Sequence, residues 1–172
     1  MKRILCLLIV LAFTSNAFAQ LRQRIELAEV TSEENNVELE VFKMQDNGQY
    51  YLSVGHLGIG DDVIQLQIDP LFELFIPLGE SASEALENLK KIQSYYKFAP
   101  DRYTETEGCL CMSYPDDNFE PVRVTYKKLI ISRVLEFSIR RPSGMRATFI
   151  PRSDFNSLVG SFKFYCKLHP SE

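Results

Sequence analysis

"FIPLGESASEALENLKKIQSYYK", residues 75–97, changes from a strand pattern to a helix pattern within a few residues and decides the fold class. After its Ile-Pro pair, apolar residues recur every three or four positions, which is the periodicity of a helix with one buried stripe. Ser81 with Glu84 three residues later is a capping-box pattern, which marks a helix start. The stretch therefore predicts an amphipathic helix, whose buried stripe comprises Ala82, Ala85, Leu86, Leu89, Ile92 and Tyr96.

"FIPRSDFNSLVGSFKFYCK", residues 149–167, has the same order of strand, Ile-Pro, polar cap, amphipathic segment and Tyr-x-Lys. Residues 153–168 fit two patterns. Phe155, Leu158 and Phe162 share one helical face, whereas every second residue from Phe162 to Leu168 is apolar, as in a strand. We favour a helix here because of the parallel with residues 75–97.

Alternating apolar and polar residues elsewhere predict strands, and turn-forming residues separate them. "QDNG" at 45–48 is typical of a hairpin turn, and "PSG" at 142–144 also turns the chain. The predicted strands are residues 37–41, 49–54, 63–68, 71–78, 120–126, 127–141 and 145–151, and residues 97–109 are polar and loop-like. The expected fold class is α+β: a mainly antiparallel sheet with two helices packed on one face. Two β-β-α units are a further hypothesis.

Residues 1–19 have the three regions of a cleavable signal peptide. Lys2 and Arg3 precede an apolar run of ten residues, and Ala17-x-Ala19 supplies small residues for a cleavage site before Gln20. The apolar run is about half the length that a bilayer requires. We therefore expect an exported protein, periplasmic or secreted, that does not span the membrane after signal removal. Residues 20–172 are expected to form one domain.

Charge is unevenly distributed along the chain. Residues 20–120 contain 7 basic and 20 acidic residues, whereas residues 121–172 contain 10 basic and 3 acidic residues. Either the two halves complement each other in packing, or the basic half presents a site for anions. Export and an acidic overall charge argue against a nucleic-acid partner.

The candidate anion ligands are four arginines that flank one predicted hairpin, since guanidinium groups suit carboxylate, sulfate and phosphate. These residues are Arg140, Arg141, Arg146 and Arg152. The loop "VGHLGIGDD" at residues 54–62 is a weaker candidate. It could use His56, Asp61 and Asp62 as metal ligands or as a base, but we favour a plain hairpin loop.

Three cysteines follow the signal peptide: Cys109, Cys111 and Cys166. A direct bridge between Cys109 and Cys111 would be strained, because in a strand they stand about 7 Å apart on one face. We predict that Cys166 pairs with Cys109 or Cys111. Free buried thiols remain the alternative. A weaker alternative is zinc held by the three cysteines and His169, whose Cys-x-Cys spacing is unusual for such a site.

No catalytic or cofactor motif stands out, and we expect no cofactor. Two hypotheses for function remain. The first is a non-catalytic binding or interaction module for an envelope or extracellular partner, with an anionic ligand as one candidate. The second is a small extracytoplasmic hydrolase that uses acidic residues no motif marks.

Overall fold

The computed structural model describes residues 24–55, 73–110, 120–141 and 144–170. Eight strands, β1 to β8, lie in chain order in one antiparallel sheet. The strands are β1 (Arg24–Ser32), β2 (Val37–Met44), β3 (Tyr50–Gly55), β4 (Glu73–Gly79), β5 (Tyr103–Leu110), β6 (Glu120–Lys128), β7 (Arg133–Arg141) and β8 (Gly144–Pro151). Helix α2 (Ala82–Ser94), with the short 3-10 helix η1 (Tyr95–Lys97), follows β4, and α3 (Arg152–Leu168) follows β8. The α+β class and the antiparallel sheet are confirmed.

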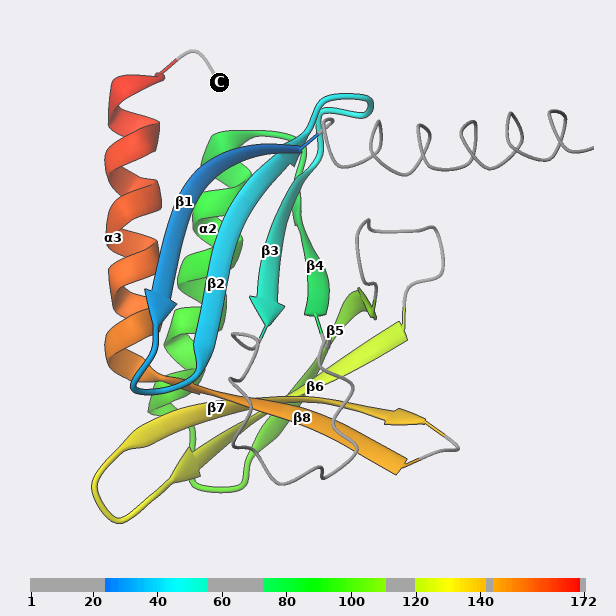
Figure 1. The fold of residues 1–172 in the computed structure, drawn as a ribbon, viewed down its shortest axis with the longest axis vertical. Helices are drawn as coiled ribbons and strands as arrows, with labels where there is room; N and C mark the ends of the chain where they lie inside the picture. The colour runs from blue at the N-terminus through cyan, green and yellow to red at the C-terminus, as the bar shows by residue number, and fades with distance from the viewer. Residues whose placement is uncertain (1–23, 56–72, 111–119, 142–143, 171–172) are drawn as a thin grey trace, which may run out of the picture.

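The sheet consists of two meanders of four strands (Figure 1). The first meander is β1–β4 and the second is β5–β8. They are joined by β4 and β5, whose register pairs among the described residues are Leu74 with Leu110 and Phe75 with Cys109. Each meander is followed in the chain by one helix, so the repeated order of the sequence corresponds to four strands and a helix rather than two strands and a helix.

Helix α2 begins as its capping-box pattern predicts. The Ser81 hydroxyl accepts a hydrogen bond from the Glu84 N–H at 3.2 Å. The Glu84 carboxylate reaches back to the Glu80 N–H at 3.0 Å, one residue earlier than the usual capping-box partner. Gly79 makes this possible: its φ is +122°, and a Cβ there would lie 2.3 Å from the Glu84 side chain. Gly79, Ser81 and Glu84 therefore fix the start of the helix.

Residues 152–168 form helix α3, so the preference for helix over strand is confirmed. Unlike α2, this helix follows a proline, and no side chain caps its start. Its buried residues are Phe155, Leu158, Val159 and Phe162, the helical face that the sequence indicated. Every second residue from Phe162 to Leu168 is apolar, but Phe164 and Leu168 are exposed.

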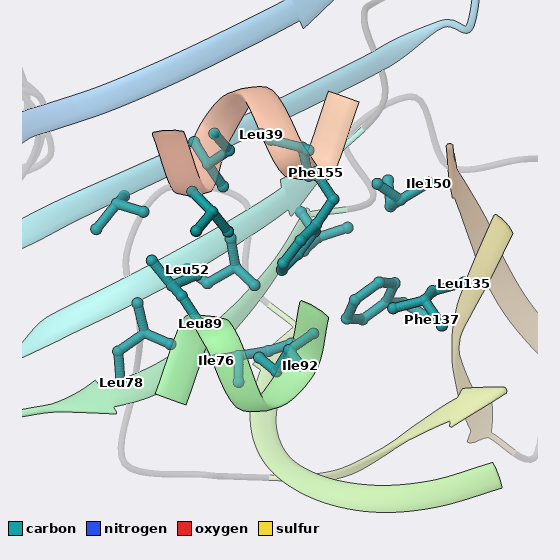
Figure 2. Packing of buried hydrophobic residues seen from close by; sticks show 14 of the residues in the cluster. Leu39, Leu52, Ile76, Leu78, Leu89, Ile92, Leu135, Phe137, Ile150 and Phe155 are labelled. Carbon is teal, nitrogen blue, oxygen red and sulfur yellow. The ribbon is translucent and has the colours of Figure 1, made fainter. Parts of the chain in front are cut away.

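One large core contains residues of both helices and both meanders (Figure 2). Leu89 of α2 and Phe155 of α3 belong to the same cluster as Leu52 of the first meander and Phe137 of the second. The predicted α2 stripe is buried at Ala82, Ala85, Leu89, Ile92 and Tyr96, while Leu86 is partly buried. Tyr96 also donates its hydroxyl to the Ile150 carbonyl at 2.8 Å, which ties η1 to β8.

A second, smaller core lies on the first meander and the adjoining strand β5. It consists of Phe42, Met44, Tyr51, Phe75 and Cys109. The residues from the first meander alternate along their strands with those of the large core, so both faces of this part of the sheet are buried. Arg24 lies over the ring of Phe42 at 4.2 Å and forms an ion pair with the buried Glu40.

The structure differs from the predicted secondary structure at three places. Strand β1 was not predicted, and β5 occupies much of the stretch 97–109 that we expected to be a loop. On β5, Thr104 and Thr106 occupy positions on the core face, opposite Val124 and Val122. The strand therefore lacks a clear alternation of apolar and polar residues. The stretch 127–141 is not one strand but the end of β6, a turn and β7. The expected strand 63–68, the signal peptide 1–19 and two residues of the turn 142–144 lie outside the described residues.

Candidate functional site

The second meander has exposed aromatic and charged side chains on the face away from the core. Strand pairing aligns Tyr103, Thr125, Glu136 and Phe149 in one row across β5–β8. Tyr103 and Phe149, at the two ends of this row, are each about half exposed. Exposed aromatic rings at both ends of a row provide apolar contact area for a partner.

Arg123 of β6 lies beside Tyr103 on this face. Its guanidinium carbon is 4.2 Å from the centre of the Tyr103 ring, a cation–π distance. One terminal nitrogen is 3.6 Å from the Glu105 carboxylate, and both side chains are about half exposed. This guanidinium is therefore held in place by a ring and a carboxylate while part of it still faces solvent.

Lys127, two residues further along β6 than Thr125, is engaged in ion pairs. Its ammonium group is 2.9 Å from Asp101 and 4.0 Å from Glu136. The hydrogen bond to Asp101 raises the pKa of Lys127 above its ordinary value. This end of the meander is thus an ion-pair cluster, in which two carboxylates lie next to one lysine that stays protonated.

Arg140, Arg141 and Arg146 occupy neighbouring backbone positions of one hairpin. In the pairing of β7 with β8, Ile139 is opposite Arg146, Arg140 is opposite Met145, and Arg141 is opposite Gly144. The three arginines therefore occupy three consecutive register pairs. Arg123 is paired with Ser138, which is two residues from Arg140 along β7, or about 7 Å. We call this set, Arg123, Arg140, Arg141 and Arg146, the basic end.

Arg152 does not belong to the basic end. It follows Pro151 at the other end of β8, six residues beyond Arg146, so about 20 Å of strand separates them. Arg152 is exposed on the first turn of α3. The sequence grouped four arginines, and the structure places three of them at consecutive register pairs of one hairpin. Arg123 was missed because its proximity to Arg140 depends on the pairing of β6 with β7.

The cysteines are not brought together where the structure describes them. Cys166 is a free thiol, and no disulfide joins it to Cys109. Cys109 lies in the small core, while Cys166 packs against the large core, with its sulfur 3.7 Å from the Ala82 carbonyl. Burial raises the pKa of the Cys166 thiol. The structure thus does not contain a Cys109–Cys166 bridge. Cys111 lies outside the described residues, so its pairing with Cys166 stays a prediction.

The weaker candidates are reported in the same way. His56, Asp61 and Asp62 lie outside the described residues. His169 stacks on Tyr165 with ring centres 4.5 Å apart. Within the part of the chain that the structure describes, no group of three or more His, Cys, Asp or Glu side chains could hold a metal ion. The zinc alternative is therefore not assembled from Cys109, Cys166 and His169, and its remaining ligand, Cys111, is not described.

Comparisons with protein-family models, with curated proteins and with solved structures found no match to this chain. Among the described helices, none combines the length and the apolar character that crossing a bilayer requires.

Proposed function

We propose that the protein is a non-catalytic binding module that recognises an anionic group of its partner at the basic end. The observation that carries this proposal is the register of β7 with β8, in which Arg140, Arg141 and Arg146 occupy consecutive pairs. Guanidinium groups bind carboxylates, sulfates and phosphates through paired N–H donors. A partner of this chemistry would meet several such groups within one hairpin.

The surroundings of the basic end support this assignment. Arg123 is already oriented by Tyr103 and remains half exposed. Binding a ligand would therefore cost little side-chain conformational entropy at Arg123. The acidic residues Glu105 and Glu107 lie on β5, on the far side of β6 from the β7–β8 hairpin. Charge is therefore graded across the second meander from acidic to basic, which orients an anionic partner toward β7 and β8.

The proposed partner is an envelope or extracellular molecule, because we also propose that residues 1–19 are removed during export. Support for export comes from the order of basic, apolar and small residues in that segment. N-terminal mass analysis of protein recovered outside the cytoplasm should find Gln20 as the first residue. Recovery of a chain that retains Met1 in the membrane fraction would contradict export as a soluble protein.

We further propose that α2 and α3 cover the same face of the sheet and that the chain consists of two strand–helix units. The helices touch through Gln93, whose amide donates to the Asn156 side chain at 2.8 Å. Both also supply residues to the large core. A Gln93→Cys/Asn156→Cys variant should form a cross-link under mild oxidation, which peptide mapping would identify. Its absence in folded protein would contradict this arrangement.

The binding proposal is tested with the chain from Gln20 onwards and a panel of sulfate, phosphate, sulfated glycan and acidic peptide. We expect at least one anionic probe to raise the melting temperature of the wild type, because ligands that bind only the folded state stabilise it. The variant Arg140→Gln/Arg141→Gln/Arg146→Gln should lose this increase. Neutral glycans serve as the uncharged comparison.

The matched control is Arg152→Gln, which removes an exposed arginine at the opposite end of β8. It should keep the increase in melting temperature. If the triple variant and the control lose the effect equally, the response depends on net charge and not on the basic end. If no anionic probe shifts the wild type, the proposed ligand class is wrong.

A further inference from the structure

The turn between β6 and β7 is made of aliphatic residues that the fold leaves in solvent. Leu129, Ile130 and Ile131 have relative exposures of 49%, 104% and 96%. The hairpin that carries them projects from the second meander, in yellow at the lower left of Figure 1. We call Leu129, Ile130 and Ile131 the apolar tip. Exposed aliphatic residues that adjoin in this way mark an interaction site more often than scattered ones do.

Turn formation does not explain these residues. The Leu129 N–H donates to the Ser132 carbonyl at 2.9 Å, so Ile130 and Ile131 are the two residues of a tight hairpin loop. Neither isoleucine has a positive φ, so the backbone does not require glycine here, but turns are usually made of Gly, Pro, Asn, Asp or Ser. The isoleucines contribute nothing to the core, since they are fully exposed. Their presence therefore points to a contact outside the chain.

Basic residues surround the base of the apolar tip. Lys128 and Arg133 form the last register pair before the turn, and both are exposed. Lys127 lies next to them but is paired with Asp101. Two cations immediately behind three aliphatic residues resemble the composition of segments that enter the interface of an anionic membrane, where long basic side chains reach the headgroups.

The shape of the tip favours a membrane over a protein partner. A stable protein interface takes about 800 Å² from each side, far more than three aliphatic side chains offer. A convex tip also needs a matching pocket on a protein, whereas a bilayer accepts apolar side chains without one. We propose that the apolar tip inserts into the interface of a membrane that contains anionic lipids, with Lys128 and Arg133 at the headgroups. This surface is distinct from the basic end.

The test is flotation with vesicles of phosphatidylcholine, with and without phosphatidylglycerol. It uses the chain from Gln20 onwards, because the apolar run within residues 1–19 would itself enter lipid; this chain contains all the described strands and helices. We expect binding to the anionic vesicles that weakens with added salt. Ile130→Asn/Ile131→Gly should weaken it by about tenfold or more, since two aliphatic side chains leave the lipid. Asn and Gly are common turn residues and the isoleucines are fully exposed, so this variant should fold, which its urea midpoint would verify.

Two further variants distinguish the outcomes. Lys128→Gln/Arg133→Gln should remove the preference for anionic vesicles. Phe164→Asn, which changes an exposed apolar residue on α3, should bind as the wild type does. The proposal is overturned if the wild type binds no vesicles, if the tip variant binds equally well, or if Phe164→Asn loses as much binding. Dimerisation abolished by the tip variant, without vesicle binding, would assign the tip to a second copy instead.

Discussion

The two meanders bury their strands differently. In the first, all six residues of β3 are buried, and the small core covers the face of the sheet opposite the large core. In the second, β6 buries Val122 and Val124 in the large core, while Arg123 between them is exposed. A strand buried on both faces has no surface left for a ligand. Strand β3 therefore offers no surface to a ligand, and both proposed contact surfaces belong to the second meander.

The largest effect should come from the core that the two meanders share. Leu89→Ala removes a fully buried side chain of α2 and should lower the free energy of unfolding by about 2–5 kcal/mol. Because residues of both meanders contribute to this core, we expect one cooperative urea transition at a lower midpoint. Circular dichroism and tyrosine fluorescence should both report the same transition.

Glu87→Ala is the control for Leu89→Ala, since Glu87 is exposed on the same helix. It should change stability by less than about 0.5 kcal/mol. Asn88 would be a poor control because its amide donates to the Leu78 carbonyl at 2.8 Å. Two separate transitions in Leu89→Ala would mean that the meanders unfold independently, which would contradict a single domain.

The second prediction concerns the ion pair between Arg24 and Glu40 on the first meander. Arg24→Met should cost about 2–4 kcal/mol, because it leaves the Glu40 carboxylate buried without this partner; the figure is below that for a fully buried pair since Arg24 is partly exposed. Arg24→Met/Glu40→Leu should recover most of the loss. Urea unfolding of the two variants and of Glu40→Leu completes the cycle. Additive losses would mean that the ion pair does not couple the two residues.

The third prediction tests the link between η1 and β8. Tyr96→Phe removes the hydroxyl that donates to the Ile150 carbonyl, which should cost about 1–3 kcal/mol at neutral pH. Burial raises the pKa of Tyr96 far above its ordinary value. Above a pH of about 10 the unfolded state loses this proton while the folded state keeps it, so wild-type stability falls as pH rises.

Tyr96→Phe should therefore lose stability more slowly than the wild type as pH rises above about 10. The measurement is the urea midpoint across that range, and Tyr103→Phe is the control because Tyr103 is exposed. Parallel curves for Tyr96→Phe and the wild type would show that the Tyr96 hydroxyl does not carry this dependence.

How far the sequence predicts this molecule depends on whether a feature is local. Helix α2 was predictable because its stripe and its cap lie within consecutive turns. The turn at residues 129–132 was not, since Ile130 and Ile131 are typical of strands. Strand β1 was also missed.

The candidate site follows the same division. The grouping of Arg140, Arg141 and Arg146 was predictable because they flank one short hairpin. The contact of Arg123 with Tyr103 and that of Arg24 with Glu40 join different strands, so they depend on strand order and register, which local patterns do not encode.

The smallest expected effect is a difference in stability between variants at the starts of the two helices. Ser81→Ala removes the hydroxyl that accepts the Glu84 N–H and should cost about 1 kcal/mol, the usual value of a helix N-cap. Ser153→Ala, in the first turn of α3, should cost less than about 0.5 kcal/mol, because Ser153 caps no backbone N–H there. Urea unfolding of both variants measures the difference. Equal losses would mean that α3 depends on its first turn as much as α2 does, and that packing against β8 does not replace the missing cap.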